Sequence, residues 1–177
     1  MHPLLVAIAS FVVMEPVTAL THRFVMHGAG RVLHRSHHRA VRPGKSPRRW
    51  EANDLYPVAF ASVVMIGLAV GFNVDGWSVL VPIGCGVTAY GAAYALVHDA
   101  YIHGRLPVFG NRRLPGFERL AAAHRIHHRR GNAPYGMLLP IVGRQDRAGG
   151  GTSGGDGVAG GSTSGSGSRP SHEPVDA

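Results

Sequence analysis

The chain has 177 residues, of which 45% are hydrophobic, and a formal net charge of +8 with a pI near 10.8. One domain is expected at this length. The basic balance would suit nucleic-acid binding, but no RNA- or DNA-binding pattern accompanies it, and we expect no nucleic-acid partner. The only cysteine, Cys85, lies in an apolar run, so the sequence offers neither an internal disulfide nor a thiolate metal site.

Three long apolar runs divide the sequence. Residues 3–21 contain a single charge, Glu15, and residues 57–72 and 77–97 contain none. Their lengths approach the roughly 20 residues that a helix needs to cross a bilayer. The turn residues 73–76 (NVDG) make the second and third runs a helical hairpin. The first run lacks the basic start and cleavage site of a secretory signal, so we expect it to be a retained helix. The predicted fold is an all-α, integral membrane helical bundle of about three to four spans.

The distribution of positive charge predicts the orientation of this bundle. All 18 Lys and Arg residues follow either the first or the third run, and none lies near the N-terminus or in the 73–76 turn. The positive-inside rule then places the basic segments in the cytoplasm, in a multi-pass protein of the inner (cytoplasmic) membrane. We expect residues 1–143 to form this membrane domain, and the Gly/Ser-rich residues 144–177 to be a disordered tail.

Ten of the twelve histidines follow one pattern that occurs twice, Hx4H followed by HxxHH. They are His22, His27, His34, His37, His38, His98, His103, His124, His127 and His128. Positions i, i+3 and i+4 share a helix face, so each HxxHH directs three imidazoles into one volume. An i/i+5 pair is about 140° apart on an ideal α-helix, which suits either ligands at a helix end or ligands of two different metals.

Ten imidazoles exceed what one six-coordinate ion can use, so the pattern predicts a cytoplasmic site for two metals. A structural histidine cluster is the alternative, and His2 and His172, near the chain ends, are expected to be bystanders.

Two carboxylates are candidate catalytic residues beside this site. Glu15 lies about two helical turns before His22, where we expect it to bond an imidazole unless it is solvated. Asp99 adjoins His98 and is expected to orient an imidazole of another motif. The pair Asn53–Asp54 is predicted first as a helix N-cap, with a contact to the site as the alternative.

Tyr90, Tyr94 and Tyr101 are candidate substrate contacts, because their spacing places them on one face of the third helix as it approaches the histidines. Gly84, Gly86 and Gly91 make that helix slim. Small residues in a membrane helix serve close packing, and the alternative is that they line a slot for a rigid substrate.

The histidine pattern beside membrane spans resembles the fatty acid hydroxylase superfamily of membrane di-iron enzymes. The words THRFVMHG, HRSHH, EANDLYPVAFA, TAYGAAYALVHDAYIH and AHRIHH are similar to one branch, the bacterial β-carotene 3-hydroxylases. The resemblance extends over roughly residues 15–135 and leaves out the extreme N-terminus and the tail.

This resemblance implies a non-haem di-iron monooxygenase of carotenoid biosynthesis. Two iron ions and O2 would hydroxylate the rings of β-carotene to give β-cryptoxanthin and then zeaxanthin, with electrons from ferredoxin and its reductase. The sequence has no Rossmann fingerprint or haem attachment motif, so a partner has to deliver those electrons. The alternatives are a related hydroxylase or desaturase acting on a fatty acyl chain or sterol, and a membrane metal-binding or transport protein.

Overall fold

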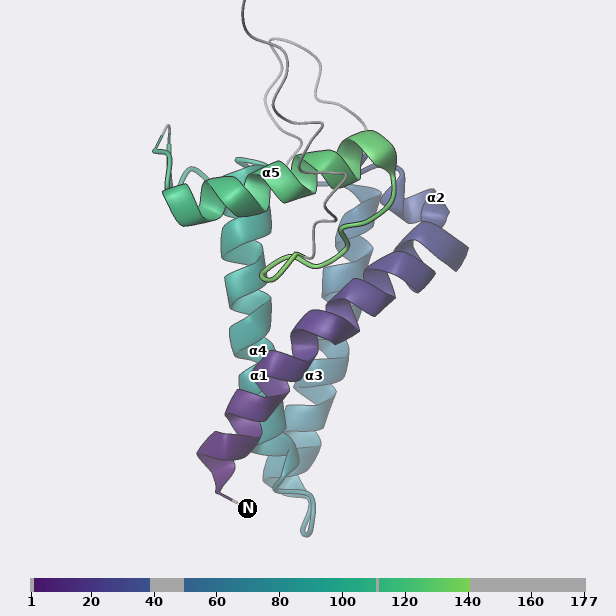
Figure 1. The fold of residues 1–177 in the computed structure, drawn as a ribbon. Helices are drawn as coiled ribbons and strands as arrows, with labels where there is room; N and C mark the ends of the chain where they lie inside the picture. The colour runs from purple at the N-terminus through teal and green to yellow at the C-terminus, as the bar shows by residue number, and fades with distance from the viewer. Residues whose placement is uncertain (1, 39–49, 111, 141–177) are drawn as a thin grey trace, which may run out of the picture.

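A computed structural model describes residues 2–38, 50–110 and 112–140, and within these ranges every regular element is a helix (Figure 1). In chain order they are α1 (Pro3–Leu20), the π-helix η1 (Thr21–Ala29), α2 (Arg31–His34), the 3-10 helix η2 (Ala52–Asp54), α3 (Leu55–Asn73), α4 (Leu80–Ala95), the π-helix η3 (Leu96–Ile102) and α5 (Pro115–Arg130). The predicted tail, residues 144–177, lies outside the described residues.

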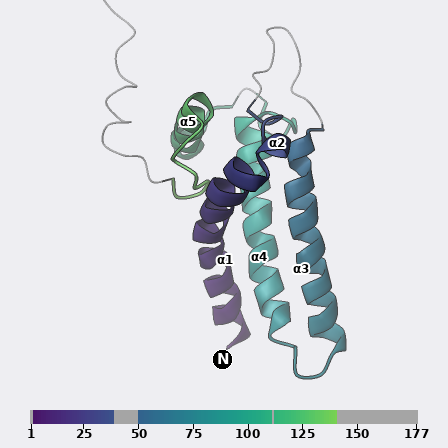
Figure 2. The same ribbon diagram turned by 90° about the vertical axis from the view of Figure 1, so that its right-hand side faces the viewer.

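Three helical segments of the described chain are long and apolar enough to cross a membrane: Pro3–Ala29, Ala52–Asn73 and Leu80–Ile102. They lie side by side, with α4 between α1 and α3 (Figure 2). The turn predicted at residues 73–76 joins α3 to α4, with Gly76 at a φ of 82°. The predicted membrane bundle is therefore confirmed with three spans. Helix α5 is not one of them, because its last turn consists of His127, His128, Arg129 and Arg130.

The sides of this bundle are apolar and uncovered. Only 6% of the most hydrophobic window of each of the first two spans is buried inside the protein. Large side chains such as Leu5, Val12 and Val63 are 62%, 60% and 68% exposed. An exposed apolar surface of this extent is stable in lipid and not in water, so the protein is a multi-pass membrane protein.

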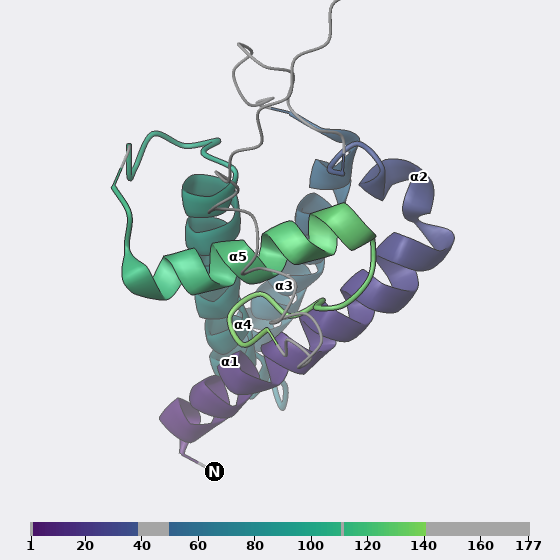
Figure 3. The same ribbon diagram turned by 45° about the horizontal axis from the view of Figure 1, so that its top comes forward.

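The buried interior lies at one end of the bundle, where α5 runs across the ends of the spans (Figures 1 and 3). It is unusually polar, because seven polar side chains are buried there: His22, His34, His37, Asn53, His98, His124 and His127. After α5 the chain turns back beneath this helix toward the spans (Figure 1). The fold therefore encloses histidines in the place where a soluble protein would have its apolar core.

Close packing of α1 on α4 depends on Gly86. A Cβ at this position would lie 2.1 Å from the carbonyl oxygen of Ala7 and 2.9 Å from Cβ of Ser10. At Gly84 the nearest neighbour is instead the movable side chain of Leu68, and at Gly91 no atom lies within 4 Å. Of the two roles considered for the glycines, close helix packing is therefore the one that Gly86 fulfils.

Gly86→Ala should destabilise the protein by about 1–3 kcal/mol, because α1 must move away from α4 to admit the methyl group. Gly91→Ala is the matched control in the same helix and should be neutral or slightly stabilising, since alanine is the better helix former. Thermal unfolding in detergent measures both. Equal melting temperatures for the two variants would contradict the close contact.

Candidate metal centre

Both Hx4H motifs lie in π-helical turns at the same end of the bundle. His22 and His27 are in η1, while His98 is in η3 and His103 follows its last residue. The backbone N–H of His103 donates to the carbonyl of His98 at 3.0 Å, which is the i→i+5 bond of a π-turn. Residues five apart then lie one above the other. The 140° separation expected for an α-helix is wrong here, and each pair directs both imidazoles to the same side.

The structure gathers the ten motif histidines into two adjacent groups. The ligand atoms within each group lie within 4.8 Å of one another. The five-histidine group consists of His22, His27, His34, His38 and His127, and the four-histidine group consists of His37, His98, His103 and His124. His128 lies beside the second group, with its Nε2 3.2 Å from Nε2 of His37. The sequence predicted the ten residues but not this division.

Each HxxHH motif contributes to both groups, which is why the groups are neighbours. His34 and His38 belong to the first group, whereas His37 between them belongs to the second. In α5 the order is reversed, because His124 belongs to the second group and His127 to the first. The ring of His38 stacks on that of His128 with centroids 4.5 Å apart. Neither HxxHH motif therefore belongs to one group alone, so the two groups have to lie side by side.

Oxygen acceptors hold the outer nitrogen of five of these rings. Backbone carbonyls accept from Nδ1 in the first group, Tyr135 O from His22 (3.2 Å) and Asn132 O from His127 (2.6 Å). The amide oxygen of Asn53 accepts from Nδ1 of His34 at 2.7 Å. The contact with the histidine site, given above as the alternative prediction for Asn53, is therefore present.

Carboxylates perform the same role in the four-histidine group. Glu51 accepts from Nδ1 of His37 at 3.2 Å, and Asp99 accepts from Nδ1 of His98 at 3.1 Å. Asp99 was expected to orient an imidazole of another motif. This prediction is wrong, because Asp99 accepts from the ring of the preceding residue, His98. All five rings are fixed with the proton on Nδ1, which leaves Nε2 as a bare acceptor facing inward.

The inward-facing Nε2 atoms lie so close together that a cation between them would relieve their repulsion. His22 Nε2 lies 3.1 Å from His34 Nε2, and His37 Nε2 lies 3.1 Å from His98 Nε2. No hydrogen bond can join either pair of neutral rings, because all four protons are on Nδ1. Lone pairs at this separation repel unless a positive ion lies among them. The donor set, all imidazole nitrogen with no thiolate, suits a transition metal such as iron or zinc.

Burial also keeps the histidines outside the spans in the neutral form that binds metal. It lowers the pKa of His34 and His127 to about 4, of His103 to about 3 and of His128 to about 2. Neighbouring histidines lower these pKa values further because a second proton nearby would be repelled. At neutral pH, metal binding therefore requires no deprotonation of these rings.

An arginine that sequence reasoning missed connects the supports of the four-histidine group. Arg105 makes a two-pronged ion pair with Asp54, at 2.8 and 2.5 Å, and contacts Asp99 at 3.2 Å. Asp54 in turn accepts from the backbone N–H of Glu51 at 2.9 Å. Glu51 and Arg105 lie outside the histidine motifs, and their charge alone did not distinguish them from the other charged residues of the sequence. Together these residues lock η2 against η3.

Glu15 is connected to the site by a different route from the one predicted. Its carboxylate accepts from the hydroxyl of Tyr90 (2.6 Å) and from the backbone N–H groups of residues 137, 138 and 139 (2.9, 3.1 and 2.9 Å). The predicted bond to an imidazole is wrong, because these four donors take up its oxygens. Glu15 instead anchors the returning segment that also carries Tyr135 and Asn132.

The three tyrosines do not form one column. Tyr90 donates to Glu15, and the ring of Tyr94 lies 4.9 Å from that of His98. Tyr101 points elsewhere, since its hydroxyl donates to Glu118 at 2.7 Å. The prediction of a common face is wrong for Tyr101 because η3 is a π-helix, in which the α-helical spacing no longer applies.

The fold and the histidine groups define a class, that of membrane proteins with two adjacent histidine groups, able to hold metal ions, at the ends of their spans. The model of the fatty acid hydroxylase family matches residues 7–150, and the chain belongs to this family. It is 41% identical over 140 residues to a "Beta-carotene hydroxylase" of Pseudescherichia vulneris, which covers 76% of this chain and 74% of that protein.

A second bacterial relative, the "Beta-carotene hydroxylase" of Pantoea ananas, is 37% identical over 76% of this chain and 75% of its own length. "Beta-carotene hydroxylase 1, chloroplastic" of Capsicum annuum is 37% identical over 71% of this chain and 40% of the longer plant protein. No solved structure matches the chain.

The division of the histidines into two groups predicts how the metal content changes when one histidine is replaced. After anaerobic loading, the protein should hold about two iron ions per chain, since ten imidazoles overfill one octahedral ion. His22→Ala and His98→Ala should each lower the content by about one ion, from different groups, while His2→Ala should lose none. Elemental analysis and Mössbauer spectra measure the content. A wild type saturated at one mononuclear iron would contradict two sites.

Glu15→Gln should weaken metal binding in the five-histidine group by roughly 10–100-fold, because the amide cannot accept all three backbone N–H groups and the acceptors for His22 and His127 move. Glu51→Gln should have the corresponding effect on the four-histidine group, through His37. Asp75→Asn, in the exposed turn at the other end of the bundle, is the control. Metal titration with each variant tests this, and a loss from both groups in Glu15→Gln would contradict the separate supports.

Proposed function

We propose that this protein is a β-carotene 3-hydroxylase that converts β-carotene to β-cryptoxanthin and then to zeaxanthin. Two findings together carry the proposal. The structure places two groups of imidazoles at the ends of membrane spans. The sequence is 34–41% identical to proteins named as β-carotene hydroxylases in bacteria and plants. The substrate is a hydrocarbon that resides in the bilayer. An oxidising site at the end of the spans suits it, since the terminal ring can reach the site while the chain stays in lipid.

The reaction consumes one O2, two electrons and two protons for each hydroxyl group formed. A ring C–H bond becomes C–OH, and the second oxygen atom leaves as water. Two iron ions, one per histidine group, would supply the activation of O2 when bound, because imidazole-ligated Fe(II) is suited to this chemistry. We assign His22, His27, His34, His38 and His127 to one ion, and His37, His98, His103 and His124, with His128 beside them, to the other.

The remaining residues hold these imidazoles in place. Asp99 and Glu51 keep the protons of two rings on Nδ1, and Glu15 fixes the returning segment beneath the first group. The ring of Tyr94 lies against that of His98, and Tyr90 lies one turn earlier on α4; we propose that the substrate ring contacts both. Further from the site, we propose that a cavity of about 250 Å³ beside Phe11, Cys85 and Ala89 offers the polyene chain an apolar surface.

Electrons would come from a soluble ferredoxin and its reductase. The described chain has no dinucleotide-binding or haem motif, and the positive-inside rule supports a basic face on the cytoplasmic side of the inner membrane. An acidic carrier can approach that face. A metal store or transporter is the non-enzymatic alternative, but transporters bind their ions near the midplane of the membrane, and here the histidines lie at the span ends.

Expression in bacterial cells that accumulate β-carotene should convert this pigment to zeaxanthin, measured by chromatography of the extracted carotenoids. His127→Ala, at equal protein level, should abolish the conversion because a fully buried ligand is removed. His2→Ala and His172→Ala should leave it unchanged, since neither residue belongs to a motif. Unchanged β-carotene together with new hydroxylated acyl chains or sterols in the wild type would favour the alternative lipid substrates.

A further inference from the structure

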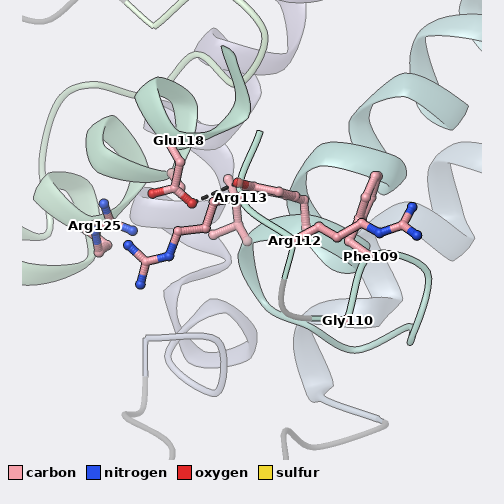
Figure 4. Close-up of a pocket in the computed structure, with 9 residues that line it drawn as sticks. Phe109, Gly110, Arg112, Arg113, Glu118 and Arg125 are labelled. Atoms are coloured by element: carbon pink, nitrogen blue, oxygen red, sulfur yellow. Dashed lines mark hydrogen bonds between the residues drawn. The ribbon is translucent and has the colours of Figure 1, made fainter. Parts of the chain in front are cut away.

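A polar cavity lies outside the two histidine groups, where the third span ends. It has a volume of about 440 Å³ and lies between the end of η3, the loop that follows and the first three turns of α5. Its lining includes Phe109, Arg112, Arg113, Glu118 and Arg125 (Figure 4). None of these residues is part of the machinery described above.

The walls of this cavity are fixed before any ligand binds. The rings of Tyr101, Phe109 and Phe117 pack edge to face, with centroids 5.1–5.8 Å apart. The hydroxyl of Tyr101 accepts from the backbone N–H of Leu114 at 2.9 Å and donates to Glu118 at 2.7 Å. Tyr101 therefore holds the loop against α5.

The cavity carries unbalanced positive charge. Arg113 and Arg125 extend into the space beside Glu118, whereas Arg112 extends along Phe109 at the other side (Figure 4). None of the three arginines forms an ion pair with a residue that the structure describes, and Glu118, whose oxygen is bonded to Tyr101, is the one carboxylate in the lining. Two converging guanidinium groups provide the forked donors that bind phosphate oxygens.

The position of the cavity indicates where the phosphate comes from. Tyr101 and Ile102 line it and are the last residues of the span Leu80–Ile102, so the cavity lies at the level of the lipid headgroups. The adjoining loop exposes Leu106 and Val108, at 51% and 58%. A dissolved anion would gain nothing from these apolar neighbours, whereas the glycerol and acyl chains of a lipid would cover them.

We propose that this cavity binds the phosphate headgroup of an anionic phospholipid, with Arg113 and Arg125 as its ligands and Arg112 at the rim. Basic pockets at the cytoplasmic ends of membrane spans recognise such headgroups. The bound lipid would tie α5, which carries three of the histidines, to the membrane surface.

Native mass spectrometry of the full chain in detergent, titrated with phosphatidylglycerol, tests the proposal. The wild type should bind one such lipid in preference to phosphatidylcholine. The affinity of Arg113→Gln/Arg125→Gln for this lipid should be lower than that of the wild type by roughly tenfold or more. Arg119→Gln/Arg129→Gln removes the same charge from exposed positions of α5 outside the cavity and should bind normally. Glu118→Gln keeps an acceptor for Tyr101, removes the negative charge and should bind more tightly.

Equal losses in the two double variants would show diffuse attraction to a basic surface and overturn the proposal. So would inorganic phosphate binding to the wild type as tightly as the lipid. Unchanged lipid binding in Arg113→Gln/Arg125→Gln, with slower reduction by a soluble acidic electron carrier, would reassign the cavity to a protein partner. Melting temperatures in phosphatidylcholine confirm that each variant is folded.

Discussion

Five of the six buried imidazoles have an oxygen beside Nδ1, which keeps the proton on that nitrogen and leaves Nε2 bare for a metal. Helices cannot supply these oxygens easily, because their carbonyls already accept backbone hydrogen bonds. Four of the five come from the short segments beside the helices, Glu51 and Asn53 just before α3 and the carbonyls of Asn132 and Tyr135 after α5, and the fifth is the side chain of Asp99 in η3. The need to hold the outer nitrogens thus explains why these two segments lie where they do.

The segment after α5 carries a cost that Glu15 offsets. It returns toward the spans, where backbone N–H groups without partners would be costly because lipid offers none. The carboxylate of Glu15 accepts three consecutive N–H groups at once. A charged residue in an otherwise apolar helix is therefore explained by the backbone that it satisfies, and it supports the metal centre through two carbonyls of the same segment.

Features that depend on local sequence were predicted well. The three spans follow from hydropathy, the hairpin from its turn residues, and the gathering of the ten histidines at one end of the bundle from their spacing. The division of the histidines depends on how distant segments meet, and carbonyls such as that of Tyr135 have no sequence signature at all. The π-turns were missed because periodicity was judged on an α-helix, and this also misplaced Tyr101. Asp99 and Glu15 were recognised as residues of interest, but their partners were not.

The two π-helical turns also bear on how the lengths of these motifs can vary. A π-turn is equivalent to an α-turn with one residue inserted. Removing a residue between His98 and His103 would give an i/i+4 pair on an α-helix, which still shares one face. The imidazoles would tolerate either length, but everything after the turn would rotate by about 100°. The inserted residue thus sets the direction in which the chain leaves the membrane at each of the two turns.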